Sequence, residues 1–245
     1  MKETRKTMLT PGDIAYIIDA STLKLDTSRE DVNSLIEACK KYRFGCAFAW
    51  PACYELLREK LKGTGTAFGT SLSFPSGQET TFIKVAQAHY FESLGAAEVD
   101  MVMNIGWLKS KQYRDVTDDI KAVRQACKNS SLKVIIEAML LTDEEIATAC
   151  AIVIDAGANY VKSGTGFSAA PTTIHHVETM KAAIGDTIKL KVAGGVRDLK
   201  TLVAMYKKGA DRFGIGLPSA VSIMEEALAL PGNIDVESEE LRVKN

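Results

Sequence analysis

The segments Tyr160-Val-Lys-Ser-Gly-Thr-Gly-Phe167 and Lys189-Leu-Lys-Val-Ala-Gly-Gly-Val-Arg197 share one pattern. In each, a short apolar run contains a lysine and leads directly into glycines. Lysine is normally excluded from strand interiors and is solvated on helix faces. The pattern therefore indicates a repeating unit in which a strand carries a lysine into a glycine-rich loop. Because the two units are one repeat apart, their amines are expected to lie close together.

The same alternation of apolar runs and amphipathic stretches continues along the chain. Strands are predicted over 14–19, 46–49, 66–73, 99–104, 133–138, 160–163, 190–192 and 212–215. Helices are predicted over 29–42, 52–61, 79–94, 113–128, 143–156, 173–184, 199–208 and 220–230. Thr142 and Glu145 have the spacing of a capping box, and Gly157-Ala158 is typical of a turn from helix to strand. Eight alternating pairs predict an α/β fold, the (β/α)8 TIM barrel.

The barrel is expected to form a single domain. Residues 1–245 would contain a barrel core at about 12–230 and a polar C-terminal tail at 231–245. An open doubly wound sheet is the alternative, but it needs a phosphate-binding turn after the first strand. Asp19-Ala20-Ser21-Thr22 contains no Gly-x-Gly-x-x-Gly. In barrels the reactive groups lie at the carboxyl ends of the strands, so these positions are the candidates for a site.

The composition excludes several function classes. The 245 residues are 46% hydrophobic and have a net charge of -1, which gives no attraction toward nucleic acid or an anionic membrane. No apolar stretch approaches the roughly 18 residues of a membrane span, and the polar N-terminus lacks a signal core. We therefore expect a cytoplasmic protein. Five cysteines without Cys-x-x-Cys, and histidines without zinc-site spacing, predict neither a metal nor a cofactor.

Four charged residues stand at or near strand ends. Asp100 lies in an otherwise apolar strand, Glu137 follows Lys-Val-Ile-Ile, and Lys162 and Lys191 end the next two strands. Opposite charges offset the cost of burying one another, so a cluster of these residues in one barrel mouth is self-consistent. A buried ion-pair network that only stabilises the barrel is the structural alternative.

Two lysines beside an acid also suit imine chemistry. A neighbouring cation lowers the pKa of an amine, and the neutral amine attacks a carbonyl to form a Schiff base. The imine then accepts electrons from a breaking carbon–carbon bond while the acid moves protons. This chemistry requires no metal.

Glycine-rich loops form a second pattern. Backbone amides in such loops bind phosphate well, and barrels often place phosphate near strands seven and eight. Arg197 would add positive charge. The candidate substrate- or phosphate-binding residues are Gly164, Thr165, Gly166, Gly194, Gly195, Arg197, Gly214, Gly216 and Ser219. Glycines alone mark tight turns in most barrels, so the prediction of a phosphate-binding site depends on the lysines beside them.

Over about residues 17–224, the chain resembles the class I deoxyribose-phosphate aldolase family. The resemblance rests on Glu98-Val-Asp-Met-Val-Met-Asn-Ile-Gly106, Lys133-Val-Ile-Ile-Glu137, Leu141-Thr-Asp-Glu-Glu145, Gly209-Ala-Asp-Arg212 and the two lysine segments.

The resemblance implies reversible cleavage of 2-deoxy-D-ribose 5-phosphate to acetaldehyde and D-glyceraldehyde 3-phosphate. Lys162 would form the imine, Lys191 would lower its pKa, and Asp100 would transfer protons with Lys191 and a water. The resemblance also implies a homodimer or homotetramer and a role in nucleoside catabolism. The remaining residues that we expect to support the site are Asp19, Ser21, Lys24 and Glu137.

Several positions depart from the family pattern. Ser163-Gly164 and Val192-Ala193 replace the family's Thr-Ser and Ala-Ser pairs, and Phe48 stands where a cysteine is expected. The strand-eight loop 214–220 is two residues longer, and Ser219 is its only hydroxyl. The catalytic set is intact, whereas the phosphate loop is altered. The alternatives are therefore a related Schiff-base aldolase with another substrate, a non-catalytic sugar-phosphate-binding barrel, and an isomerase that forms no imine.

Overall fold

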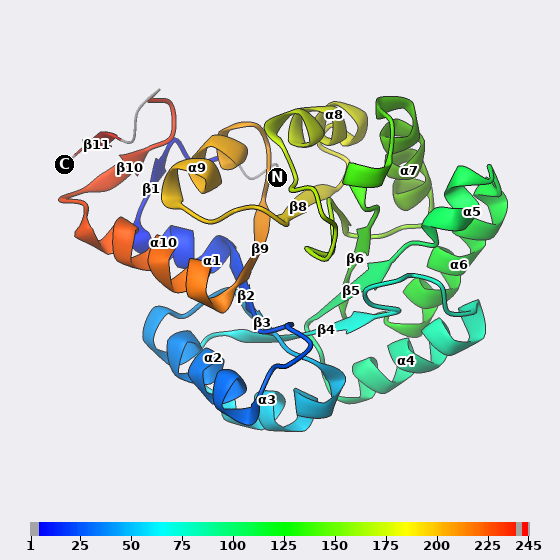
Figure 1. Ribbon diagram of the computed structural model, residues 1–245, viewed down its shortest axis with the longest axis horizontal. Helices are drawn as coiled ribbons and strands as arrows, with labels where there is room; N and C mark the ends of the chain where they lie inside the picture. The colour runs from blue at the N-terminus through cyan, green and yellow to red at the C-terminus, as the bar shows by residue number, and fades with distance from the viewer. Residues whose placement is uncertain (1–4, 239–241, 245) are drawn as a thin grey trace.

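The computed structural model describes residues 5–238 and 242–244. Eight parallel strands form a closed barrel in the order β2-β3-β4-β5-β6-β7-β8-β9, which confirms the predicted single-domain (β/α)8 architecture. Figure 1 looks along the barrel, with the strands around the centre and the helices outside them. No helix among the described residues is long and apolar enough to cross a bilayer.

The barrel strands are short and almost entirely buried. They are β2 (Ile18–Ser21), β3 (Cys46–Phe48), β4 (Ala67–Leu72), β5 (Glu98–Val102), β6 (Ser131–Ile135), β7 (Tyr160–Lys162), β8 (Lys189–Ala193) and β9 (Arg212–Gly216). In this register Lys162 on β7 lies opposite Lys191 on β8, and Asp19 on β2 lies opposite Gly214 on β9. The register therefore brings three predicted site residues and the glycine loop to one end of the barrel.

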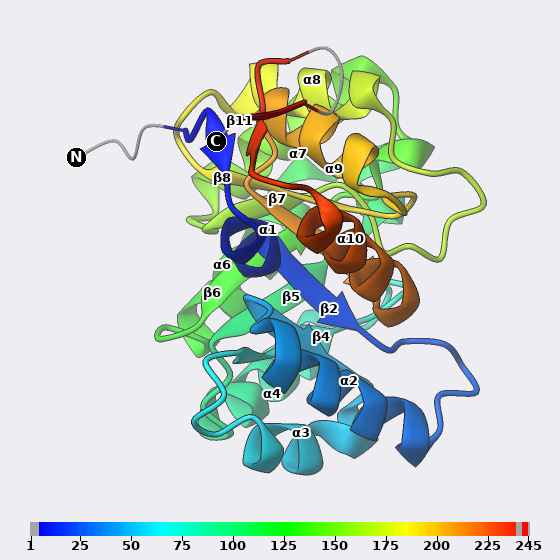
Figure 2. The same ribbon diagram turned by 90° about the vertical axis from the view of Figure 1, so that its left-hand side faces the viewer.

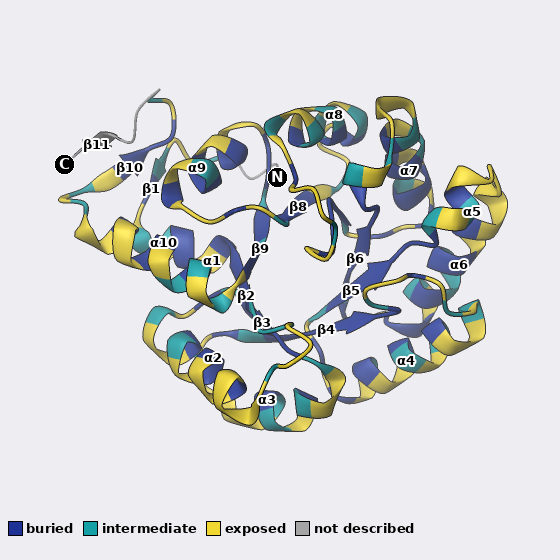
Figure 3. Ribbon diagram, in the orientation of Figure 1, coloured by how far each residue is buried: buried dark blue, intermediate teal, exposed yellow. Residues whose placement is uncertain are grey.

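The helices form the outer layer. They are α2 (Arg29–Tyr42), α3 (Tyr54–Lys60), α4 (Thr81–Ser93), α5 (Ile105–Lys109), α6 (Tyr113–Ala126), α7 (Asp143–Asp155), α8 (Ile174–Ile184), α9 (Leu199–Lys207) and α10 (Leu217–Ala229). Each turns a buried face toward the strands and an exposed face outward, as Figure 3 shows. The capping box of Thr142 and Glu145 is present at the start of α7.

The prediction of a strand over 14–19 was wrong for its first four residues. Residues Pro11–Ile17 form helix α1, and the strand begins at Ile18. Thr10 and Asp13 make a capping box there, and Pro11 occupies the first helical turn. Both are helix-start signals. The apolar run from Ile14 onward has the composition of a buried strand, which concealed them.

The prediction for 133–138 also extended too far. Strand β6 ends at Ile135, Glu137 takes a left-handed conformation with φ 49°, and Ala138–Leu140 form a 3-10 turn. The short helix α5 was not predicted; Asn104 caps it by accepting a hydrogen bond from the Trp107 amide at 3.0 Å.

Part of the expected polar tail is packed into a second, small sheet. β10 (Asn233–Asp235) pairs antiparallel with β1 (Met8–Leu9) and with β11 (Arg242–Lys244). Ile234 and Val236 are buried. Figure 2 shows this sheet beside α1, at the opposite end of β2 from the long loop that follows that strand. The described residues near both chain ends therefore lie on the side of the molecule away from the barrel mouth.

Candidate active site

Lys162, Lys191 and Asp100 meet inside the barrel, where Lys162 ends β7 and the other two are the middle residues of β8 and β5. Both ammonium nitrogens bind the same carboxylate oxygen, Asp100 Oδ2, at 2.8 Å from Lys162 and 2.7 Å from Lys191. All three residues are buried. Three of the four predicted residues thus form the cluster, with the carboxylate between the two amines, whereas Glu137 does not join it.

The two lysines have different surroundings. Lys191 also contacts Asp19 at 2.6 Å, and its nitrogen lies 4.3 Å from the centre of the Phe48 ring. Two carboxylates and an aromatic face thus surround the nitrogen of Lys191. Lys162 contacts one carboxylate, and its side chain is 7% exposed compared with 1% for Lys191. Lys162 is therefore the more accessible of the two amines and the one with less to stabilise its charge.

Burial lowers the pKa of Lys162, and the nearby charge of Lys191 lowers it further, while Asp100 opposes both effects. Burial acts to raise the pKa of Asp100, but Lys162 and Lys191 outweigh it, so that this pKa lies below its usual value. The predicted influence of Lys191 on Lys162 thus has the expected sign. The arrangement favours an amine that is neutral closer to physiological pH than an ordinary lysine.

One oxygen of Asp100 lacks a partner. Oδ2 holds both lysines, whereas Oδ1 is buried and accepts no hydrogen bond from any described residue. A buried carboxylate oxygen without a donor is costly, and such atoms are common at functional sites. Oδ1 therefore keeps its capacity to accept a hydrogen bond.

A second group of charges lies below the lysines. Asp19 contacts Lys133 at 3.1 Å and pairs closely with Arg212, and these two cations both contact Glu98 as well. Burial acts to raise the pKa of Asp19, but Lys133, Lys191 and Arg212 hold it well below its usual value. Asp19 thus remains a carboxylate deep in the barrel.

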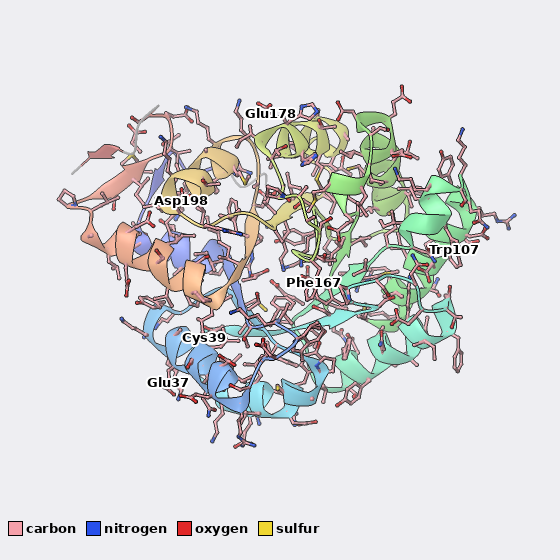
Figure 4. All side chains as sticks on the ribbon, in the orientation of Figure 1. Glu37, Cys39, Trp107, Phe167, Glu178 and Asp198 are labelled. Atoms are coloured by element: carbon pink, nitrogen blue, oxygen red, sulfur yellow. The ribbon has the colours of Figure 1, made fainter. Side chains whose placement is uncertain are left out.

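The lysines open into a pocket of about 450 Å³ at the carboxyl ends of the strands. Most of the predicted site residues line it: Asp19, Ser21, Lys24, Asp100, Lys162, Thr165, Gly166, Lys191, Gly194, Gly195, Arg197, Gly214, Gly216 and Ser219. Phe167 lines the same pocket and lies near the centre of the view in Figure 4. Its ring packs edge-on against Phe74 and Trp50, with centroid distances of 5.4 and 6.2 Å.

Two predicted residues do not line this pocket. The carboxylate of Glu137 accepts hydrogen bonds from the Thr165 amide at 3.3 Å and so holds the loop after β7. Gly164 packs against the same region, where an added Cβ would lie 2.4 Å from the Met139 methyl group. Both residues shape the loop from behind, and neither faces the lysines.

The loop after β8 needs its glycines. Gly194 and Gly195 have φ values of 89° and 96°, a region that other residues rarely adopt. A Cβ on Gly195 would also lie 2.5 Å from Pro171. This turn places the backbone ahead of Arg197 along the pocket wall.

Segment 214–220, predicted as a loop, forms the end of β9 and the start of α10, and it is more apolar than the family pattern. Ile215, Leu217 and Pro218 line the pocket together with Ser219. Helix α10 begins at Leu217, and Pro218 in its first turn has no amide hydrogen to donate. A phosphate at this helix start would meet fewer donors than a serine-rich loop supplies.

A metal has no favourable place in the described barrel interior. Asp19, Cys46 and Glu98 bring ligand atoms within 4.8 Å of one another. However, Lys133 and Arg212 already bind both carboxylates, and burial raises the pKa of the Cys46 thiol well above its usual value. These two cations occupy the position that a metal would take.

Reasoning from the sequence missed four residues of the interior. Lys133, Glu98 and Arg212 lie one layer below the lysines, and Phe48 contacts Lys191. A signal was present for the first two, because Lys133 precedes an apolar run and Glu98 shares the alternation of Asp100. The contact of Phe48 depends on the glycine at position 69, where a Cβ would lie 2.4 Å from its ring.

A closed parallel barrel with paired lysines and a carboxylate at the carboxyl ends of its strands defines a barrel enzyme of the aldolase class. The model of the DeoC/LacD family of aldolases matches residues 12–219, and the chain belongs to this family. It is therefore a lyase that acts on small molecules.

Named relatives agree with this assignment. The chain is 39% identical over 212 residues to the deoxyribose-phosphate aldolase of Histophilus somni, covering 86% of this chain and 94% of the relative. It is 39% identical over 226 residues to that of Sinorhizobium medicae, covering 92% and 91% of the two chains. The structure of deoxyribose phosphate aldolase from Aeropyrum pernix, described as a unique tetramer, matches with a TM-score of 0.82 at 26% identity, covering 90% of this chain and 93% of that one.

Proposed function

We propose that the protein cleaves 2-deoxy-D-ribose 5-phosphate reversibly to acetaldehyde and D-glyceraldehyde 3-phosphate through an imine on Lys162. The observation that carries the proposal is the contrast between the lysines. Lys191 contacts two carboxylates, whereas Lys162 contacts one and opens to the pocket. An amine that forms an imine must be neutral and accessible, and a cation beside it must stay charged.

The reaction begins when the Lys162 nitrogen attacks the C1 aldehyde of the open-chain sugar. The carbinolamine loses water to give a protonated imine. Asp100 would accept protons during these steps, an assignment supported by its Oδ1, which has no partner among the described groups, and Lys191 would support the charge of the carboxylate.

Carbon–carbon cleavage follows from the same imine. A base removes the proton of the C3 hydroxyl, the C2–C3 bond breaks, and its electron pair moves into the imine to form an enamine. Glyceraldehyde 3-phosphate leaves with the new C3 carbonyl. A proton then adds to the terminal enamine carbon, and water hydrolyses the resulting imine to release acetaldehyde and the free Lys162 amine.

Arg197 and the backbone of Gly194, Gly195 and Gly216 are proposed to bind the phosphate, because they lie along one wall of the pocket. Thr165, Gly166, Gly214 and Ser219 line the same pocket, with Ser21 and Lys24 at its edge. Gly164 and Glu137 would act by shaping the loop after β7.

The setting of the enzyme is part of the proposal. All five cysteines are free thiols, which suits a reducing cytoplasm. The described tetramer of the Aeropyrum pernix protein supports a homodimer or homotetramer. A role in nucleoside catabolism follows from the substrate.

A second candidate is an aldolase of the same chemistry with a different substrate. It is favoured by the apolar junction of β9 and α10, where Ile215, Leu217 and Pro218 line the pocket. An acceptor aldehyde without a phosphate would meet no penalty there. A sugar-phosphate-binding barrel without catalysis is the third reading, and it leaves the paired lysines without a purpose.

Borohydride trapping distinguishes the three. The protein is incubated with acetaldehyde and, separately, with deoxyribose 5-phosphate, reduced, and mapped by peptide mass spectrometry, with Lys162→Arg as the control. Adducts on Lys162 from both compounds, together with turnover, support the proposal. An adduct from acetaldehyde alone favours the second candidate. The absence of any adduct would contradict the imine mechanism.

A further inference from the structure

The charged side chains of the barrel interior form one continuous array, defined here as Asp19, Glu98, Asp100, Lys133, Lys162, Lys191 and Arg212. From the barrel mouth inward, the contacts run from Lys162 to Asp100 at 2.8 Å, from Asp100 to Lys191 at 2.7 Å, and from Lys191 to Asp19 at 2.6 Å. Asp19 then contacts both Lys133 and Arg212, and each of these contacts Glu98. The side chain of Glu98 is the most exposed member, at 13%.

The charges of this array do not cancel when every member is ionised. It contains three carboxylates and four cationic groups, so the fully ionised array has one positive charge in excess. A net charge in a buried site is costly, and the usual remedy is a shift in protonation. The array becomes neutral when one of its cations loses a proton.

The contacts identify which cation loses its proton. Lys191 touches Asp19 and Asp100, while Lys133 and Arg212 each touch Asp19 and Glu98. Each of these three cations therefore has two carboxylate partners. Lys162 has one, and it stands at the end of the array beside the pocket. The charge of Lys162 is therefore stabilised by fewer carboxylates than the charge of any other cation of the array.

We propose that Glu98, Lys133 and Arg212, together with Asp19, are positioning residues that make the barrel interior electrically neutral when Lys162 is an uncharged amine. They act through Lys191 and Asp100. Asp19 lines the pocket, whereas Glu98, Lys133 and Arg212 do not. This inference rests on the proposed role of Lys162. According to this inference, the protonation of the reactive amine depends on the whole array of charges and not only on the neighbouring Lys191.

Other titratable groups nearby do not alter the count. Cys46 on β3 faces Asp19 and Glu98, and burial raises its thiol pKa well above the usual value, so it remains neutral. Glu137 after β6 makes no ion pair among the described residues and is bonded to the Thr165 amide. From β4, Ser71 contributes a neutral hydroxyl to the pocket. The charged groups that contact one another in the barrel interior are thus the array members on β2, β5, β6, β7, β8 and β9.

Two opposite substitutions test the proposal. Glu98→Gln removes a negative charge and should let Lys162 lose its proton more readily, moving its pH profile toward acid. Lys133→Met removes a positive charge and should move the profile toward alkali. A unit charge within about 10 Å shifts an amine pKa by about one unit at an effective dielectric constant of about 20. The double variant Glu98→Gln/Lys133→Met restores the balance, and its profile should return toward that of the wild type.

The readout is the initial rate of cyanoborohydride trapping of acetaldehyde on Lys162 between pH 6 and pH 10, measured by mass spectrometry. It depends on the amine and not on recognition of any sugar. The control is Lys84→Met, which deletes a cation from the buried pair of Lys84 and Asp119, 2.7 Å apart between α4 and α6. This variant loses a comparable ion pair outside the array, and its profile should match that of the wild type.

The outcomes separate this inference from the proposed function. If the wild type forms no adduct on Lys162, the imine mechanism itself is wrong, and the inference falls with it. If the wild type forms the adduct, opposite shifts that the double variant cancels support the neutral array. Folded variants whose profiles stay unchanged, or shift in the same direction, would overturn it. Should Lys133→Met lose its native circular dichroism, Glu98→Gln and the double variant provide the same comparison.

Discussion

Replacing Lys191 by methionine gives the most direct test of how the site activates Lys162. Methionine keeps most of the length and volume of the lysine stem and removes the charge together with the contacts to Asp100 and Asp19. Because both amines bind Asp100 Oδ2, at 2.8 and 2.7 Å, their nitrogens are no more than about 5.5 Å apart. A cation this close disfavours the ammonium form of Lys162, so its removal must raise the pKa of Lys162.

The size of the effect follows from that separation. Two unit charges about 5 Å apart interact by about 3 kcal/mol at an effective dielectric constant of about 20, which equals about two pKa units. Below both pKa values the fraction of neutral amine falls tenfold for each unit. Lys191→Met should therefore reduce the rate of imine formation near neutral pH by about 100-fold. Raising the pH should recover most of that loss.

The assay is kcat/KM for deoxyribose 5-phosphate as a function of pH, together with the rate of imine trapping by acetaldehyde. The free-enzyme limb of the profile should move about two pH units toward alkali. A profile that keeps the wild-type midpoint, in a variant with native circular dichroism, would refute the electrostatic role of Lys191. A rate that is equally low at every pH would show instead that Lys191 acts in a proton-transfer step.

Three further predictions concern the rest of the site. Asp100→Asn should lower kcat by about 100-fold or more, and should slow deuterium incorporation into the methyl group of acetaldehyde, because proton transfer is lost; normal exchange would make Asp100 purely structural. Gly69→Ala should lower the free energy of unfolding in urea by about 1–3 kcal/mol, because the new Cβ would lie 2.4 Å from the Phe48 ring. Adding Phe48→Leu should recover part of this loss, and no recovery would contradict the steric explanation. Arg197→Ala should raise KM for deoxyribose 5-phosphate without affecting unphosphorylated deoxyribose; equal effects on both would remove Arg197 from phosphate binding.

The fold could be predicted because its signals are local. Glycines at helix ends, capping boxes and alternating apolar runs specify each strand–helix unit, and eight units leave few architectures. The exceptions occurred where two local signals compete. The run from Ile14 to Ile17 is apolar enough for a strand, but the cap formed by Thr10 and Asp13 begins a helix there. The strand at Asn233–Asp235 is too short to stand out, and it exists because β1 lies beside it.

The upper layer of the site was also predictable. A charged residue in an apolar strand is unusual, and Asp100, Lys162 and Lys191 all carry this signal. The lower layer depends on long-range register. Arg212 contacts Asp19, 193 positions away in the chain, and Lys133 contacts Asp19 across 114 positions. Such partners are decided by barrel closure, which no local pattern reveals. Glu137 illustrates the reverse error, since its left-handed backbone turns an apparent strand-end acid toward a loop amide.

The order of the charges along the chain has a consequence for assembly. The three acids of the array lie on β2 and β5, and its four bases lie on β6, β7, β8 and β9. A cut between α6 and β6, at residues 127–130, would thus separate an acidic half-barrel from a basic one. Within each fragment the buried like charges would repel one another, whereas the acids of one fragment would attract the bases of the other. Co-expressed fragments should therefore recognise each other in preference to their own copies, as the two parts of a split enzyme must.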